Sequence, residues 1–486
     1  MKLILSLIFS LLLSTTVYAE GNYTEPYRPQ YHFSPRQGWI GDPSGLMLYQ
    51  GKYHMYWWGK VESSDLVHYQ EVSPMVMKDT PKGTANFTGS IAIDKDNSAG
   101  MGRNEWVAAM TLYDEDTKKQ SQGIAFSRDG LNFFHYDYNP VIDLWSTEFR
   151  DPTVFWYKPA GKWIMVVAKA RERTIKIYSS DNLKDWRWES DFNIKDDGDQ
   201  AWECPDLFQV PIQGKPDEKK WVLVVSVNWN QERYFVGDFD GRKFTLSENY
   251  PSTRVLVDKG LDYYASRTFR DYDGTMKQPV TLGWIATWAY AQKVPSTWGK
   301  GFWSLPRQYS LKEDETGWHL LQAPVPQLSS LRQKETKLSG KIPVGVTTLS
   351  RLSPSHNMYE MEVTFDASHS NTFGLNLCCG NGKSTKLIYD TDSKSFIIDR
   401  TNSSDVKIPD FDRISHHKIQ PIKGNLRLHI FVDKSSIEIF ANDGANTFTL
   451  LTYAGNTQTG IEIFALRPGT TYTLHYWPLK SIWNNR

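Results

Sequence analysis

Five segments rich in aromatic and β-branched residues recur along the first two thirds of the chain at a nearly constant interval. A Ser-Asp turn signal follows the first three, at Ser64-Asp65, Ser127-Arg128-Asp129 and Ser180-Asp181, and Asp240-Gly241 has the same phase in the fourth. Repeats of this length, built from short strands, are typical of a β-propeller with one four-stranded blade per repeat. The pattern predicts a five-bladed propeller over residues 25–325. The segments are Tyr53–Trp58, Trp106–Tyr113, Trp163–Ala170, Trp221–Val227 and Val280–Trp288.

From about residue 335 the pattern changes to strict alternation of apolar and polar residues. Tyr359–Phe365, Leu426–Val432 and Ser436–Phe440 show it most clearly, and turn sequences such as Asn442-Asp443-Gly444 separate the runs. Alternation with period two is typical of antiparallel strands that bury one face. We therefore expect an all-β protein, with a β-sandwich over residues 335–486 after the propeller.

Three acidic residues stand shortly before aromatic segments of the repeat. Asp42 precedes the first, Asp151 the third and Glu203 the fourth, and a proline follows each acid within two positions. A residue before proline is biased to the β region, so we expect extended backbone at these positions. Since the innermost strands of a propeller line one channel, acids in matching phase meet at one end of it. A lone Asp-Pro is usually a surface turn, but three in phase favour a shared site.

Paired carboxylates are what glycoside hydrolysis requires. One carboxylate attacks the anomeric carbon, and the other protonates the leaving oxygen and later activates water. Crowding of like charges raises the pKa of the proton donor. The pattern therefore predicts a glycosidase site at the mouth of the channel.

Charge and metal-ligand patterns exclude several other classes of function. The chain has 55 basic and 55 acidic residues, which gives no electrostatic footprint for nucleic acid or an anionic membrane. Asp94, Asp96, Ser98 and Glu105 imitate a calcium loop, but Ala99 replaces its glycine and no helices flank it. The histidines form no metal-binding cluster. We expect no metal and no cofactor, and the sequence does not predict the oligomeric state.

The first 19 residues have the form of a secretory signal peptide. One lysine precedes the apolar run Leu3–Leu13, and Val17-Tyr18-Ala19 fits a cleavage site. No cysteine follows the run, so we expect no lipid anchor and a secreted or periplasmic protein. Only Cys204, Cys378 and Cys379 occur, too few for a disulfide framework.

The ordered motifs WIGDPSG (39–45), FTGS (87–90), FRDP (149–152), WECPD (202–206), YFVGDFDG (234–241), GWIATW (283–288) and SLPR (304–307) resemble glycoside hydrolase family 32, the invertases, inulinases and levanases. DRTNS (399–403) and LHIFVDKSSIEIFANDG (428–444) continue the resemblance. It implies a five-bladed propeller with a β-sandwich and release of fructose from sucrose or fructans. It implies Asp42 as nucleophile, Glu203 as acid/base and Asp151 as transition-state stabiliser, with Cys204 tuning the site. It also implies sugar contacts from Trp39, Phe87, Ser90, Arg150, Asp262 and Trp288.

The chain departs from the family pattern around the first blade. Gly41 and Ser44 replace the usual asparagines beside Asp42, the stretch Met55–Gly59 is shortened, and Lys60 stands where histidine is common. We expect Trp58 to offer a stacking face to a sugar, although a core position is an equal alternative. The lost side chains leave open the hypothesis of a catalytically weak fructan-binding propeller. A different five-bladed glycosidase of the arabinan type, whose acids would also come from blade starts, is a further alternative, against which the sandwich signature argues.

Overall fold

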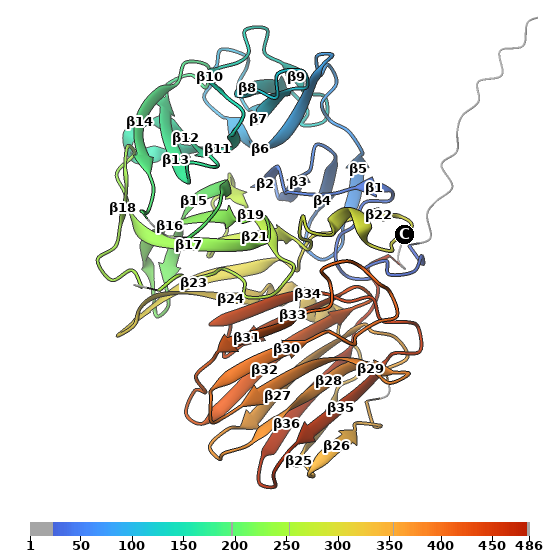
Figure 1. Ribbon diagram of the computed structural model, residues 1–486. Coiled ribbons are helices and arrows are strands. Elements are labelled where there is room, and N and C mark those ends of the chain that lie inside the picture. The colour runs from blue at the N-terminus through green and yellow to red at the C-terminus, as the bar shows by residue number, and fades with distance from the viewer. Residues whose placement is uncertain (1–22, 196–197, 252, 353, 484–486) are drawn as a thin grey trace, which may run out of the picture.

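The computed structural model describes residues 23–195, 198–251, 253–352 and 354–483. Two all-β units follow each other along the chain, the blue-to-yellow propeller and the orange-to-red sandwich of Figure 1. The predicted fold class is confirmed. The expected signal peptide lies outside the described residues. Within them, the helices are short 3-10 turns, and none is long and apolar enough to cross a membrane.

Five antiparallel blades surround the channel, and each aromatic segment of the repeat forms the second strand of its blade. Blade 1 consists of β2 (Gly45–Tyr49), β3 (Lys52–Tyr56), β4 (Lys60–Ser63) and β5 (Gln70–Ser73). Blade 2 consists of β6 (Thr84–Asp94), β7 (Glu105–Asp114) and β8 (Gln120–Ser127), with β9 (Phe134–His135) and β10 (Ile142–Ser146) both paired to β8. Blade 3 consists of β11 (Phe149–Tyr157), β12 (Lys162–Lys169), β13 (Thr174–Ser180) and β14 (Arg187–Phe192).

Blades 4 and 5 are joined into one larger sheet by a parallel bridge between Ile212 and Leu311. Blade 4 consists of β15 (Trp202–Ile212), β16 (Lys215–Val227), β17 (Gln231–Phe239) and β18 (Phe244–Leu246). Blade 5 consists of β19 (Tyr264–Thr268), β21 (Val280–Trp284), β23 (Arg307–Asp314) and β24 (Gly317–Pro324). The ring closes where β20 (Arg270–Asp271) pairs with β2 and where β1 (Gly38–Trp39) pairs with β22 (Gly299–Lys300).

The Ser-Asp signal is a turn between the third and fourth strands of a blade. In blade 2 the Ser127 hydroxyl donates to Asp129, whose Oδ1 accepts the backbone N–H groups of Leu131 and Asn132 at 2.8 and 2.9 Å. Asp65 does the same in blade 1, and Asn182 takes the role in blade 3. The repeated signal is thus a repeated side-chain cap of a tight turn.

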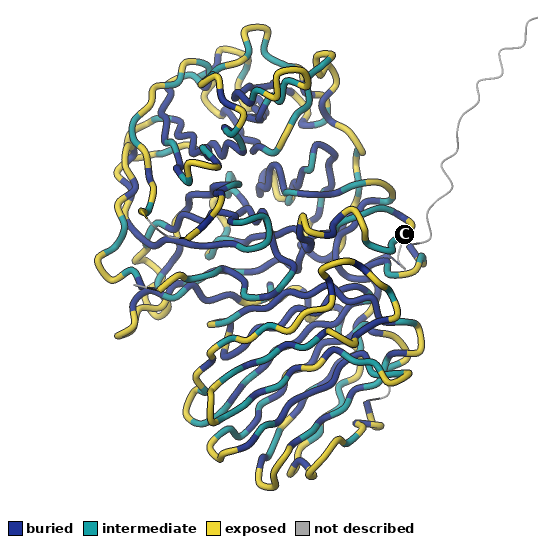
Figure 2. The backbone as a smooth tube through the Cα atoms, viewed as in Figure 1, coloured by how far each residue is buried: buried dark blue, intermediate teal, exposed yellow. Residues whose placement is uncertain are grey.

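The sandwich packs two six-stranded sheets over an apolar core that includes Phe373, Leu428, Ile439 and Phe448. Figure 2 shows its strands dark blue on the inside and its turns yellow. The first sheet contains β25 (Thr336–Lys341), β27 (Tyr359–Asp366), β32 (Asn425–Asp433), β33 (Ser436–Ala441), β34 (Asn446–Leu451) and β36 (Thr471–Pro478). The second contains β26 (Gly345–Thr348), β28 (Thr372–Gly380), β29 (Lys383–Asp390), β30 (Ser395–Asp399), β31 (Ile414–Lys418) and β35 (Gly460–Ala465).

Strand β33 docks the sandwich on the propeller through buried charges. Glu438 accepts hydrogen bonds from His32 at 2.8 Å and from Arg307, and Arg307 also contacts Asp258 at 2.8 Å. His32 contacts Asp433 at 2.8 Å through its other ring nitrogen. All five side chains are buried. The network ties the start of the chain to the second domain.

The two ends of the described chain meet beside this network. The ring of Tyr23 stacks on Trp483 with 4.0 Å between centroids, and the Trp483 indole N–H donates to the carbonyl of Pro29 at 2.7 Å. The Ile482 N–H donates to the Gln30 carbonyl at 2.9 Å. The last residues therefore cover the first ones.

Candidate active site

A β-bulge recurs near the start of the innermost strand in blades 2 to 5. The register shifts between Phe87 and Gly89, Arg150 and Thr153, Glu203 and Asp206, and Tyr264 and Arg267. Bulges re-aim the side chains that they carry and are frequent next to active sites. Here they turn side chains of different blades toward one another at one end of the channel.

Backbone conformation at these bulges differs from the extended form that the sequence predicts. Asp151, Cys204 and Ala265 have φ values of 67°, 48° and 53°. The left-handed region is costly for residues with a Cβ and is held only by surrounding contacts. For Asp151 the expectation of an extended conformation before proline is therefore wrong, because the bulge overrides the local preference. A hydrogen bond from its N–H to the Thr111 hydroxyl at 2.9 Å fixes the peptide.

Asp42 lies just before β2 with one carboxylate oxygen held and the other free. Its Oδ2 accepts from the Thr88 hydroxyl at 2.7 Å and from the Cys204 thiol at 3.5 Å. Its Oδ1 is buried and receives no hydrogen bond from the described protein. Burial raises the pKa of Asp42, and the nearby Glu203 adds to the rise despite the Thr88 hydrogen bond. A fixed carboxylate with one uncommitted oxygen is suited to attack carbon.

Asp151 stands on the neighbouring side of the same thiol. Its Oδ2 accepts from the Cys204 N–H at 3.1 Å and from the Cys204 Sγ at 3.6 Å. Burial, with the charge of Glu203 next, raises the pKa of Asp151 to about 7. Burial also raises the pKa of the Cys204 thiol far above its ordinary value, helped by both aspartates. Cys204 is therefore a protonated donor shared by two carboxylates, not a nucleophile.

Glu203 lies one residue before its bulge, between two donors from neighbouring blades. The Arg150 Nε donates to its Oε1 at 2.8 Å, and the Tyr264 hydroxyl donates to its Oε2. Arg150 is itself held by Gln120 at 3.0 Å and Glu148 at 2.9 Å. The Glu203 side chain keeps 12% of its surface exposed, so solvent or a ligand reaches it. The structure thus brings the three predicted acids and Arg150 together.

Aromatic side chains flank the acids. Trp39 lies 5.8 Å from the ring of Trp288, which is 47% exposed, and both contact Trp284. On the blade 2 side, the exposed Phe87 stacks on Tyr113 at 4.4 Å and 13°. These rings present exposed apolar surface beside the acids.

Three predicted sugar contacts have other partners in the structure. Trp58 is 8% exposed and packs in the core between blades 1 and 2, where its indole N–H donates to the Phe87 carbonyl at 3.1 Å. Strand β3 ends at Tyr56, and Trp58 follows it with φ 67°. The prediction of a stacking face at Trp58 is therefore wrong. The residue occupies the core position that was the alternative, and its indole holds the backbone of Phe87.

Ser90 and Asp262 are also buried and engaged. The Ser90 hydroxyl accepts the Val154 N–H at 2.9 Å, which fastens blade 2 to blade 3. Asp262 pairs with Arg400 of the sandwich at 2.5 Å and accepts the Leu451 N–H at 2.8 Å. Both act between structural elements, so the expected sugar contacts are corrected for them.

Gly41 explains one departure from the family pattern. A Cβ at this position would lie 3.0 Å from Trp39 Nε1, so the indole fills the space of the absent side chain. The Gly41 carbonyl accepts the Trp303 indole N–H at 3.0 Å. Lys60, another departure, is 2% exposed and pairs with Glu62 at 2.9 Å inside blade 1.

Thr88 and Tyr264 are site residues that sequence reasoning missed. Each takes part in a bulge of blade 2 or 5 and donates to an acid of another blade. The sequence contains a signal for both, because each precedes an aromatic segment of the repeat, as the acids do. Thr88 is the second residue of FTGS, and Tyr264 follows Asp262-Tyr263 before the fifth aromatic segment.

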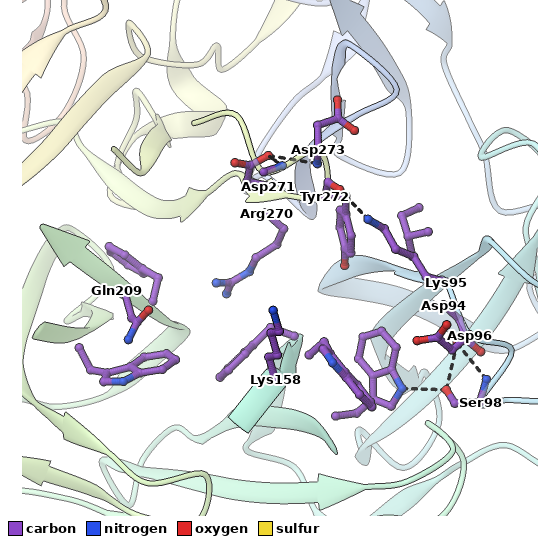
Figure 3. Close-up of a pocket in the computed structure, with 17 residues that line it drawn as sticks. Asp94, Lys95, Asp96, Ser98, Lys158, Gln209, Arg270, Asp271, Tyr272 and Asp273 are labelled. Carbon is purple, nitrogen blue, oxygen red and sulfur yellow. Dashed lines mark hydrogen bonds between the residues drawn. The ribbon is translucent and has the colours of Figure 1, made fainter. Parts of the chain in front are cut away.

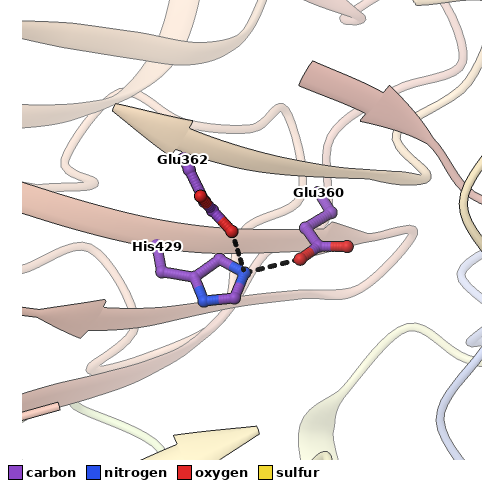
Figure 4. Close-up of side chains that lie close together, drawn as sticks. All are labelled: Glu360, Glu362 and His429. Carbon is purple, nitrogen blue, oxygen red and sulfur yellow. Dashed lines mark hydrogen bonds and ion pairs between the residues drawn. The ribbon is translucent and has the colours of Figure 1, made fainter. Parts of the chain in front are cut away.

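One group of possible metal ligands occurs among the described residues, in the sandwich and outside the acid site. Glu360, Glu362 and His429 lie together on β27 and β32 (Figure 4). Arg332 already holds Glu360 through two hydrogen bonds, at 2.7 and 2.5 Å, and His429 donates to it at 2.6 Å. The cation of Arg332 balances the acids, so the group is an ion-pair cluster.

Comparison with known proteins identifies the family of the chain. Residues 32–324 match Glycosyl hydrolases family 32 N-terminal domain, and residues 327–478 match Glycosyl hydrolases family 32 C terminal. A levanase of Bacillus subtilis is 36% identical over 98% of this chain and 74% of its own. An extracellular exo-inulinase of Aspergillus awamori is 30% identical over 95% of this chain and 96% of its own.

Solved structures show the same relationship. The exo-inulinase of Aspergillus awamori superposes with a TM-score of 0.86 at 29% identity, covering 95% of this chain and all of that one. A β-fructofuranosidase of Schwanniomyces occidentalis, in complex with fructosyl-erythritol, gives 0.81 at 29% identity over 96% and 99% of the two chains. The chain belongs to glycoside hydrolase family 32.

Proposed function

We propose that this protein is a retaining glycoside hydrolase that releases fructose from β-fructofuranosides. The observation that carries the proposal is the pairing of Asp42, which has a free Oδ1, with Glu203, which lies between Arg150 and Tyr264. The names of its relatives, levanase, exo-inulinase and β-fructofuranosidase, support fructose as the released sugar.

In the proposed mechanism Asp42 Oδ1 attacks the anomeric carbon of the terminal fructose. The bond from that carbon to the leaving oxygen breaks, and Glu203 gives this oxygen its proton. Water then attacks the fructosyl-enzyme, Glu203 takes a proton from it, and Asp42 leaves. Thr88 and Cys204 hold Asp42 throughout, so the nucleophile needs little reorientation.

Asp151 and Arg150 are proposed to hold the sugar. Asp151 has one oxygen committed to Cys204, which leaves the other for sugar hydroxyls. Trp39, Trp288 and Phe87 are proposed to contact the sugar faces. The protein is proposed to act outside the cytoplasm, because a relative is an extracellular enzyme and the first 19 residues have the form of an export signal.

Short fructans are proposed as better substrates than sucrose. The side chains that the family uses beside Asp42 are absent at Gly41 and Ser44, and each lost neutral hydrogen bond costs about 0.5–1.5 kcal/mol of binding. Longer substrates compensate through the exposed rings of Phe87 and Trp288, the role that the sequence predicts for Trp58. The experiment is a kcat/KM series over sucrose and fructo-oligosaccharides of increasing length. A preference for sucrose contradicts this specificity.

Stereochemistry tests the mechanism separately. In methanol-water mixtures a retaining enzyme transfers fructose to give the β-methyl fructoside. Formation of the α-product shows inversion and overturns the role of Asp42 as nucleophile. No fructose from any of these substrates, with a folded protein, favours the fructan-binding alternative.

A further inference from the structure

A cavity lies at the mouth of the propeller channel opposite the acids. It has a volume of about 690 Å³, within the range of ligand pockets. Its walls are the ends of innermost strands: Asp94 closes β6, Trp156 lies near the end of β11, and Gln209 lies in the second half of β15. Asp151 and Glu203 stand near the starts of β11 and β15. Five or six residues of extended strand separate the two sites by about 15–20 Å.

Aromatic rings form much of the cavity wall (Figure 3). Trp156 is 39% exposed and meets Trp163 edge to face at 5.2 Å and 67°. Trp163 is held in place because its indole N–H donates to Ser98 at 2.8 Å. Trp156 therefore presents a wide apolar surface on a rigid support, the feature that sugar rings stack on.

Most charges of the cavity are already balanced within the protein. Arg270 pairs with the buried Asp206. The Lys95 ammonium donates to the Tyr272 carbonyl at 2.6 Å, and Asp94 accepts from Ser98 and Ala99. Lys158 is the one cation of the described lining without such a partner, so the cavity holds no cluster of unpaired charges of one sign.

Three hydrogen-bonding groups remain available to a ligand. The indole N–H of Trp156, the ammonium of Lys158 and the amide of Gln209 have no hydrogen-bond or ion-pair partner in the described protein. Figure 3 shows Lys158 and Arg270 reaching into the space between the rings. Exposed aromatic surface with free donors and one amide acceptor suits a neutral ligand rich in hydroxyl groups.

We propose that this cavity binds a β-fructan chain at a site separate from the acids. The identity of the sugar rests on the proposed function, while the preference for a neutral saccharide rests on the cavity itself. A polymer held here keeps further chain ends near the catalytic mouth, which raises their effective concentration. The cavity is a retention site and takes no part in bond cleavage.

Affinity electrophoresis in gels containing levan tests the proposal. The Glu203→Gln background prevents digestion of the polymer and keeps any binding at the acids equal in all variants. Adding Trp156→Ala or Gln209→Ala should weaken retardation by levan about threefold or more for the tryptophan and less for the glutamine. Adding Trp188→Ala is the matched control, since Trp188 is 56% exposed on β14 and outside the cavity.

Equal retardation of all these variants, or none in the parent, overturns the second site. Thermal unfolding shows whether Trp156→Ala folds, and Gln209→Ala, on an exposed position, carries the test if it does not. Failure of the proposed function gives a different result: the unmutated enzyme then releases no fructose, while retardation still depends on Trp156.

Discussion

At the scale of single residues, replacing one carboxylate oxygen of Glu203 by an amide nitrogen should remove most of the activity. In Glu203→Gln the amide still accepts hydrogen bonds but can neither give nor take the catalytic proton. We expect kcat on sucrose and fructans to fall by about 10²–10⁴. The fold should be retained, which circular dichroism can verify. Near-normal turnover in a folded variant would mean that another acid carries the proton.

Asp151 links the site to the pH dependence of stability. Burial and the charge of Glu203 raise its pKa to about 7, against 3.8 for the free side chain. Between these pH values the folded state keeps a proton that the unfolded state loses, so stability falls as pH rises. Asp151→Asn keeps an acceptor for Cys204 and removes this titration. Its melting temperature should gain on the unmutated protein from pH 4 to 7 and then level off, while activity drops.

A constant difference in melting temperature across that range would contradict the raised pKa of Asp151. Asp114 offers a control: it is the half-buried last residue of β7 in blade 2, and hydrogen bonds from Thr117 lower its pKa. Asp114→Asn should therefore give no gain in melting temperature between pH 4 and 7.

The three acids could be predicted from sequence because their phase relative to the strands sets their position, and Arg150 could be predicted from the family resemblance. Their neighbours could not. Thr88 and Tyr264 become donors only through bulges, which shift the register by one residue and leave no pattern of hydrophobicity. Asp262 resembles a site acid in the sequence, because it too precedes an aromatic segment. Its partner Arg400 lies 138 positions away in another domain.

At the scale of elements, mutations in the turn between the third and fourth strands of a blade test whether the repeated side-chain cap stabilises the fold. Asp129 accepts two backbone N–H groups and the Asn132 amide at 2.7 Å, so Asp129→Ala should cost about 0.5–2 kcal/mol of unfolding free energy. Asp129→Asn should cost much less, because Asn182 makes the same bonds in blade 3. Denaturant unfolding of both variants decides this; an equal loss would mean that charge, not geometry, matters.

Strand spacing predicted the blades well, while strand ends were less predictable. The aromatic run through Trp58 and the run through Trp288 both read as continuous strands. In the structure β3 ends at Tyr56 and β21 at Trp284. Aromatic residues suit a strand and a loop packed on it equally, so composition alone cannot mark the point where pairing stops.

At the scale of the whole molecule, His32 connects the domains with a charge. Burial lowers its pKa, but hydrogen bonds to Asp433 and Glu438 outweigh this and raise it from 6.5 to about 9. Its stabilising charge is therefore fully present below pH 6.5 and lost as pH rises through 9. His32→Gln should cost about 3–5 kcal/mol at pH 6 and less at pH 9.5. Denaturant titrations at both pH values measure this, and a constant cost would refute a charged His32.

The sandwich is expected to be needed for a soluble propeller. A chain ending at Leu331 loses Phe431 and Phe440, which pack into the propeller core, and leaves Arg307 and His32 without Glu438. Exposed apolar surface beside unpaired buried charges should cause aggregation. Size-exclusion chromatography with light scattering measures it. A monomeric, fully active truncated chain would show that the propeller is independent.

The meeting of Tyr23 with Trp483 also has a consequence for the order of events during synthesis. The ribosome makes the first blade long before the residues that cover it. Until those residues emerge, His32 lacks Asp433 and the ring of Tyr23 lacks Trp483. Only when the last strand has emerged can the seam be sealed. We therefore expect the contacts of Tyr23 and His32 with the sandwich and Trp483 to be among the last to form during synthesis.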